Sequence, residues 1–225
     1  ILHLSKDARS LSLHNAASAY DRSLLRNNPA ALSVGTERNS YSSLILPSGI
    51  YSGEIQRVFE MGSVISAGKL SYISYGTIYD SETQKKTTAY DILLEMGYKK
   101  ELKNIVSVGI SGGYLLSSIC GYRSQLLYTN IGVRSRMMRK RLGIGFSLEN
   151  IGFLIASYTD VKESIPIIIR SALYYKPKYL PAIISVDIIR NLDRGIIELF
   201  GGLEFNPEKR LSIRLGCSSR RTGFF

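Results

Sequence analysis

The sequence predicts an all-β protein, an antiparallel transmembrane β-barrel preceded by a small N-terminal segment of helical and irregular structure. Three observations favour this fold. From about residue 39 onward, apolar residues alternate with small or polar ones, as in strands that have two different faces. The composition suits strands, with 15 Tyr and 20 Gly. The apolar runs are far shorter than the ~18 residues that a membrane-spanning helix needs.

The chain begins with a segment that differs from everything after it. Residues 5–32 are rich in Ala, Ser and Asn and suit short helical turns better than strands. The run Asn27-Asn28-Pro29-Ala30 then stops any helix, because proline disfavours the α conformation in the residue before it. We therefore predict a compact lead-in before the first strand.

The clearest strand lies at 90–98. Its even-numbered residues form an apolar face with a tyrosine at each end: Tyr90, Ile92, Leu94, Met96 and Tyr98. Asp91 and Glu95 fall on the opposite face. At ~3.3 Å per residue the two tyrosines lie roughly 26 Å apart, close to the ~25 Å apolar band that aromatic girdles flank on membrane barrels. We predict that Tyr90 and Tyr98 are anchors at the two membrane interfaces.

The same two faces recur along the chain and predict about eleven strands. Their expected ranges are 40–46, 49–59, 63–79, 86–98, 104–118, 123–136, 141–150, 165–175, 182–190, 196–206 and 211–219. Bacterial single-chain barrels have even strand numbers, so we expect further strands after Phe225. The alternative is that Gly223-Phe224-Phe225 is the aromatic end of a finished barrel.

A soluble β-sandwich would show the same alternation, so only the composition of the polar face distinguishes a sandwich from a membrane barrel. A solvated exterior normally carries a dense mixture of charges, whereas this face holds Gly and Ser with isolated charged residues. Small residues suit a narrow lumen, in which side chains share limited space. We therefore predict that a set of charged residues faces the lumen: Asp91, Glu95, Glu149, Arg170, Asp187, Glu204 and Arg214.

Alternate connections between the expected strands hold most of the positive charge of the chain, whose net charge is +11. The most basic of them contains Arg136, Arg139, Lys140 and Arg141. Barrels of this type keep their short turns on the periplasmic side, so we predict that this basic rim is periplasmic. The run 139–141 is expected to contact an acidic partner or lipid phosphate, with a merely solvated turn as the alternative.

The positive charge also raises the possibility of nucleic-acid binding. A sheet that binds single strands interleaves Lys and Arg with aromatic residues on one face, and the strand faces here are apolar or small. We predict no nucleic-acid partner.

No catalytic or metal-binding arrangement is evident. The two histidines, His3 and His14, lie in the lead-in, and Cys120 and Cys217 lack a metal-ligand spacing. We interpret both cysteines as unpaired, with a disulfide as the alternative. Residues 109–113 resemble a nucleophile elbow but lie in an alternating strand, which favours close packing in a sheet. We predict no enzyme activity, no cofactor and no metal.

Several short segments resemble one family in the same order along nearly the whole chain. They are Ala8-Arg9-Ser10-Leu11-Ser12-Leu13-His14-Asn15-Ala16, Asn28-Pro29-Ala30-Ala31-Leu32, Ser74-Tyr75-Gly76-Thr77-Ile78, Asn150-Ile151-Gly152, Ile165-Pro166, Gly202-Leu203-Glu204-Phe205 and Arg214-Leu215-Gly216. Together they resemble the PorV/PorQ family of outer-membrane proteins of type IX secretion, PorQ more closely than PorV. Departures include His14 in place of a usual Gly, and Thr129-Asn130-Ile131-Gly132 in place of Asp-Leu-Gly.

The resemblance implies a FadL-like barrel of about fourteen strands. Residues 1–38 would be a plug folded into the lumen and 39–225 the barrel, so that C-terminal strands are missing here. Arg9, Asn28, Pro29 and Ala30 belong to the plug, and we expect Asn28 and Pro29 to seat it.

The implied function is that of a non-enzymatic outer-membrane component that assists the export or surface attachment of secreted proteins. Its expected partners are outer-membrane lipid and other secretion-system proteins. The alternative is a FadL-like transporter of hydrophobic small molecules, which would need a connected apolar pocket behind residues 8–32.

Overall fold

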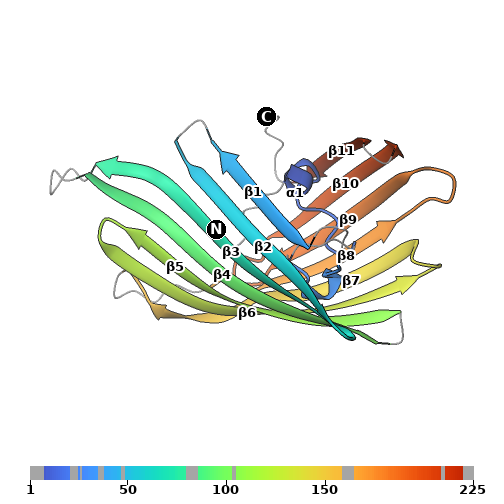
Figure 1. The fold of residues 1–225 in the computed structure, drawn as a ribbon, viewed down its shortest axis with the longest axis horizontal. Coiled ribbons are helices and arrows are strands. Elements are labelled where there is room, and N and C mark those ends of the chain that lie inside the picture. The colour runs from blue at the N-terminus through green and yellow to red at the C-terminus, as the bar shows by residue number, and fades with distance from the viewer. Residues whose placement is uncertain are drawn as a thin grey trace.

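The structure, a computed structural model, describes residues 8–20, 25, 27–34, 38–46, 49–79, 86–102, 105–158, 165–208 and 211–219. Within them, eleven antiparallel strands form one sheet in which each strand pairs with the next along the chain (Figure 1). The all-β class is confirmed. The sheet is not closed, because β1 and β11 are not paired with each other.

The elements begin and end as follows. Helical structure comprises α1 (Ala8–Ser12) and the 3₁₀ turn η1 (Pro29–Ala31). The strands are β1 (Asn39–Ile45), β2 (Tyr51–Met61), β3 (Val64–Tyr79), β4 (Lys86–Leu102), β5 (Val106–Ile119), β6 (Tyr122–Met137), β7 (Leu142–Ala156), β8 (Ile168–Tyr175), β9 (Ala182–Asn191), β10 (Ile197–Glu208) and β11 (Leu211–Ser218).

Two strands are longer than the sequence pattern predicts. β4 continues past residue 98 to Leu102, because Lys99 keeps the alternation and points to the interior although its charge suggests a turn. β7 continues to Ala156, beyond the end of the expected strand 141–150. Asn150 has a positive φ of 62° and the register with β6 shifts beside it, so the alternation changes phase there while the strand goes on.

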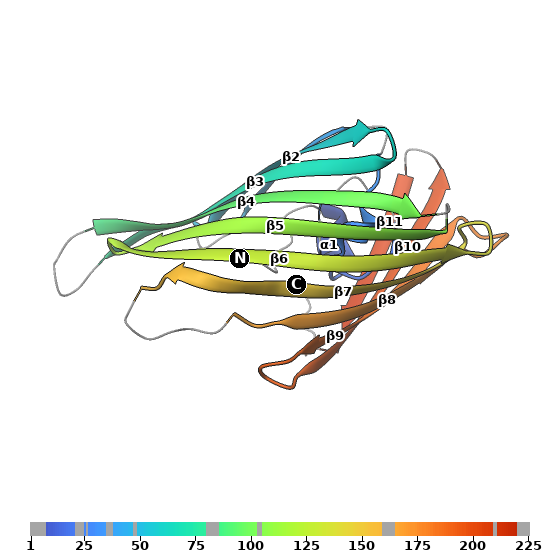
Figure 2. The ribbon, with the colours of Figure 1, turned by 90° about the horizontal axis from the view of Figure 1, so that it is seen from below.

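The sheet curves into a trough, and the N-terminal segment lies in its hollow (Figures 1 and 2). α1 contacts β11, and η1 contacts β4, β5, β6 and β7. Small apolar clusters join the segment to the sheet at both sides of the trough. Leu25 and Leu32 pack on Val58 and Ala67, while Ala19 packs against the cluster that contains Tyr174.

Burial is inverted relative to a soluble sandwich, in which large apolar side chains face the core. On β4 the apolar side chains lie on the convex face, where Met96 is 65% and Tyr98 is 52% exposed. The opposite face buries charges, since Asp91 is 6% and Glu95 is 5% exposed. The other central strands also turn their charged residues inward, where these lie beside apolar clusters such as Leu93, Leu126 and Tyr128. The interior of the trough is therefore mixed, with many buried charges, and its outside is apolar.

Among the described residues, no helix is long and apolar enough to cross a membrane.

Candidate functional site

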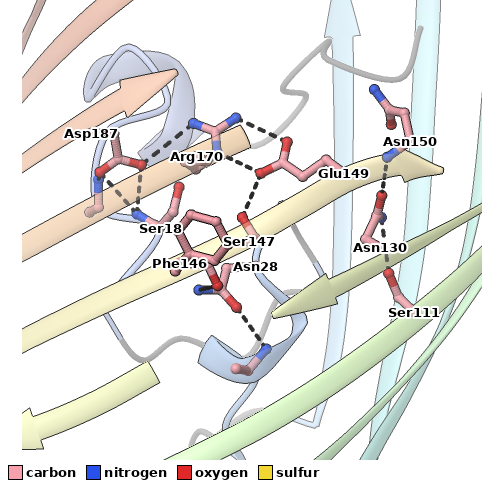
Figure 3. Close-up of polar contacts among 12 residues, drawn as sticks. Ser18, Asn28, Ser111, Asn130, Phe146, Ser147, Glu149, Asn150, Arg170 and Asp187 are labelled. Atoms are coloured by element: carbon pink, nitrogen blue, oxygen red, sulfur yellow. Dashed lines mark hydrogen bonds and ion pairs between the residues drawn. The ribbon is translucent and has the colours of Figure 1, made fainter. Parts of the chain in front are cut away.

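The candidate site is the concave interior, where the N-terminal segment meets the inner faces of the strands. Asn28 makes the central contact. Its Oδ1 accepts a hydrogen bond of 3.0 Å from the backbone N–H of Ala30 and so caps η1, whose first residue is Pro29. Its Nδ2 donates to the backbone oxygen of Phe146 on β7, at 3.5 Å (Figure 3). It also donates to the backbone oxygen of Val133 on β6, at 3.4 Å.

Glycines on the inner faces of β5, β6 and β7 provide the space for this turn. A Cβ at Gly132 would overlap the Asn28 side chain, and a Cβ at Gly109 would overlap the backbone of Pro29 and Ala30. Beside them, Ser107 Oγ donates to the oxygen of Ala30 at 2.9 Å. The glycines of the polar face therefore leave room for the N-terminal segment itself.

A buried ionic cluster holds a second part of the segment. Asp187 on β9 is fully buried and accepts hydrogen bonds from the backbone N–H groups of Ala17, at 2.9 Å, and Ser18, at 3.2 Å. Arg170 on β8 lies between two carboxylates (Figure 3). It makes a two-pronged contact with Glu149 at 2.7 and 3.3 Å and reaches Asp187 at 3.5 Å. The charge on Arg170 thus partly neutralises the carboxylate that binds the segment.

A third contact fixes α1. Arg9 Nε lies 2.7 Å from the buried Glu204 carboxylate on β10, and Arg214 on β11 lies 3.5 Å from the same oxygen. The Arg9 guanidinium also lies over the Tyr20 ring, at 5.4 Å from its centroid. A Cβ at Gly216 would overlap the backbone of residues 12–14, so small residues again make room for the segment.

The fourth contact is at Leu25, on the side of β2 and β3. Its backbone N–H donates to Gln56 at 2.7 Å, and its oxygen accepts from Lys69 at 3.3 Å. Lys69 also forms an ion pair of 2.6 Å with Glu95 on β4. Further along β4, Asp91 accepts a hydrogen bond of 2.7 Å from Tyr75.

Sequence reasoning missed several residues of this interior. Gln56 and Lys69 occupy inward positions of alternating strands, which is the signal that could have found them. Asn130 joins Ser111 to the backbone N–H of Asn150 through bonds of 3.0 and 2.8 Å (Figure 3). No periodic signal marks this chain of contacts, because it depends on the irregularity at Asn150.

The structure corrects the prediction that Arg136 is a turn residue. It lies within β6, its side chain is buried, and its Nη2 is 2.7 Å from Glu101 Oε1. Lys99 lies 2.9 Å from the same oxygen. Glu101 is beyond Tyr98, outside the apolar band. Partial burial opposes ionisation there, but Lys99 and Arg136 outweigh it and lower the pKa of Glu101.

The other basic residues of that connection are at the surface. Arg139, Lys140 and Arg141 lie in the turn between β6 and β7, and all three are exposed. The Lys140 carbonyl accepts a hydrogen bond of 3.3 Å from Tyr174. At the predicted interfaces, Tyr90 and Tyr98 both lie on the outward face of β4, and Tyr90 stacks on Tyr72 with ring centroids 6.3 Å apart.

Two cavities beside the described part of the N-terminal segment are small or mixed in character. One of about 40 Å³ is lined by residues that include Arg9, Ser10 and Asn15. Another of about 290 Å³ is lined by Arg170 and Glu198 together with apolar residues. Neither is the connected apolar pocket that a transporter of hydrophobic molecules would need behind residues 8–32.

Within the described residues, no three His, Cys, Asp or Glu side chains gather as metal ligands. Cys120 and Cys217 are free thiols. Residues 109–113 lie inside β5, as the alternation predicts.

Comparison with protein-family models and with curated proteins finds no match to this chain.

Proposed function

We propose that this chain is an outer-membrane protein whose strands cross the bilayer as the wall of a barrel. The inverted burial supports this proposal most strongly. The convex face carries a continuous apolar surface over β2 to β10, and the interior carries ion pairs. Large apolar surfaces of this kind mark contacts with proteins or membranes. Lipid suits a face that extends over so many neighbouring strands.

The proposed role is that of a non-enzymatic component of type IX protein secretion, which assists the export or surface attachment of secreted proteins. The resemblance to the PorV/PorQ family supports this role. It is carried in part by the segment Asn28-Pro29-Ala30, and these residues fasten the N-terminal segment to β5, β6 and β7. The segment that carries the resemblance is thus central to the interior of the fold.

A docking platform suits this interior better than a transporter does. The N-terminal segment is fixed at three places. Its own Asn28 contacts β6, Asp187 of β9 binds its backbone, and Glu204 of β10 pairs with its Arg9. Opening a passage would break these buried contacts together, and removing one partner of a buried ion pair costs about 3–5 kcal/mol. The exposed turn 139–141 offers positive charge to an acidic periplasmic partner.

Gene deletion in the native bacterium tests the secretion role. We expect the deletion strain to lose proteins from its surface and culture medium, measured by quantitative mass spectrometry, and the wild-type gene to restore them. A variant with Arg139, Lys140 and Arg141 changed to Ser should restore them only in part. The matched control changes Arg123 and Arg194 to Ser, because both are exposed near the opposite rim.

An unchanged set of exported proteins in the deletion strain would contradict the secretion role. Full restoration by the 139–141 variant would contradict only the docking role of that turn.

A further inference from the structure

A row of residues crosses the outward face of the sheet, and each is the register partner of the next. From β2 to β6 the row is Arg57, Gly68, Met96, Gly112 and Thr129. The adjacent row is bulky and apolar: Ile55, Leu70, Leu94, Tyr114 and Leu127. The two rows form a furrow of about 670 Å³ that is lined by residues from both. The row of five residues spans roughly 19 Å, at ~4.8 Å per strand.

The fold does not require the two glycines that form the floor of this furrow. A Cβ at Gly68 would meet no atom within 4 Å, and a Cβ at Gly112 would meet only the Tyr128 oxygen, at an ordinary 3.6 Å. The inward Gly109 and Gly132 differ, because the N-terminal segment fills the space beside them. Glycine inside a strand is less favourable than alanine and often marks the close approach of another group. The floor of the furrow is therefore open to a group from outside the chain.

Arg57 places a positive charge at one end of the furrow. It is exposed on the outward face of β2, between the apolar residues Ile55 and Phe59. Its guanidinium carbon lies 5.2 Å from the centroid of the Phe59 ring, which is on the side of the basic rim. Phe59 pairs with Ser66 of β3, and Ser66 pairs with Tyr98 of β4, so Phe59 and Tyr98 lie in the same row across the sheet. A long basic side chain near a membrane interface directs its charge toward the headgroups in this way.

We propose that the furrow binds a phosphoglycerolipid, with its phosphate against Arg57 and one acyl chain along Gly68, Met96 and Gly112. The proposal rests on the proposed membrane-spanning function. A guanidinium beside an apolar furrow complements a ligand that joins an anionic phosphate to a hydrocarbon chain. The basic rim is the one assigned to the periplasm, so the lipid belongs to the periplasmic leaflet.

Native mass spectrometry of the full-length protein in mild detergent tests the site. The probes are dioleoyl phosphatidylglycerol and dioleoylglycerol, which share their chains but differ in the phosphate. We expect the wild type to retain phosphatidylglycerol about tenfold more strongly than dioleoylglycerol. Arg57→Gln should lower phosphatidylglycerol retention about tenfold. Gly68→Leu should lower the retention of both lipids, because it places a bulky side chain in the furrow at a position where an added Cβ meets no atom within 4 Å.

Arg190→Gln is the matched control, because Arg190 is exposed on the outward side of β9 and lies outside the furrow. It should retain lipid as the wild type does. Equal phosphatidylglycerol retention by the wild type, Arg57→Gln and Gly68→Leu would overturn the lipid site. Equal retention of the two lipids by the wild type would overturn the phosphate contact.

Flotation with phosphatidylcholine vesicles distinguishes a failure of the membrane-spanning function from a failure of the lipid site alone. A wild type that does not float with the vesicles would contradict the membrane-spanning function and the lipid site with it. A wild type that floats while its lipid retention is insensitive to both variants would contradict the lipid site alone.

Discussion

Single side chains from distant strands decide where the N-terminal segment lies. Asn28 uses its amide to cap η1 and to contact β6 and β7. Asp187 uses one carboxylate to accept backbone N–H groups from the segment while Arg170 balances its charge. In both cases a buried polar group stabilises the contact because its hydrogen-bonding capacity is satisfied by the chain itself.

Asp187→Asn should destabilise the fold by about 3 kcal/mol, because it removes the charge that faces Arg170 in a buried site. We expect a lower midpoint in urea unfolding and faster proteolysis of the N-terminal segment. Asp193→Asn is the control, since Asp193 is exposed in the turn between β9 and β10. Equal stability of the two variants would show that the Asp187 contact contributes little.

Asn28→Ala should cost about 1–2 kcal/mol, because it removes the cap of η1 and the hydrogen bonds of the Asn28 amide to backbone oxygens of β6 and β7. The effect should appear as increased amide hydrogen exchange in the segment 27–34, while the strands keep their protection. Unchanged exchange in that segment would contradict the role assigned to Asn28.

The contribution of Glu101 to the stability of the basic rim should depend on pH. Its pKa is lowered in the folded state, so its contribution to stability is present above the unfolded pKa of about 4.3 and is lost as the pH falls through the folded value. Glu101→Gln should therefore lower the melting temperature at pH 7, and the difference from the wild type should shrink below about pH 4. A difference that is independent of pH would contradict this assignment.

At the scale of elements, the central strands have different requirements on their two faces. Inward glycines such as Gly132 are needed because the N-terminal segment occupies the space of their missing side chains. Outward glycines such as Gly68 have open space instead. The alternation of β5 and β6 is visible in the sequence, whereas the purpose of each small residue depends on what lies against it.

Gly132→Ala tests this difference between faces. The added methyl group would overlap Asn28, so we expect the N-terminal segment to become accessible to protease while the circular dichroism of the strands is retained. Gly68→Ala is the matched control and should protect the segment as the wild type does. Protection in both variants would contradict the packing described for η1.

For the whole molecule, a convex face that spans a bilayer should tolerate an added charge less well the deeper it lies in the bilayer. Leu94→Arg places a charge in the middle of the outward stripe and should cost about 2–4 kcal/mol in vesicles, whereas Leu102→Arg, beyond Tyr98, should cost about 0–1 kcal/mol. Urea unfolding from phosphatidylcholine vesicles measures both. Equal costs would contradict a membrane-spanning orientation of β4, since both side chains are similarly exposed.

The extent of each strand could be predicted where the alternation is regular, as in 104–118 and 123–136, which correspond to β5 and β6. The prediction fails at Lys99, whose charge suggests a turn although β4 continues through it, and at Asn150, where an extra residue reverses the phase of the pattern. The inward charges could be assigned to a face, but their partners could not. Arg170 and Glu149 are separated by 21 residues, and only strand register brings them together.

The sequence alone determined that the chain forms an antiparallel sheet with one apolar and one polar or small face, because period-two alternation is a local property of neighbouring residues. The small residues and isolated charges of one face also predicted that this face turns inward. Tertiary structure decided what fills the hollow and which inward charges form ion pairs. Those outcomes depend on the curvature of the whole sheet and on contacts such as Ala17 with Asp187, between residues 170 positions apart. Spacing within a strand carries no information about such distant pairs.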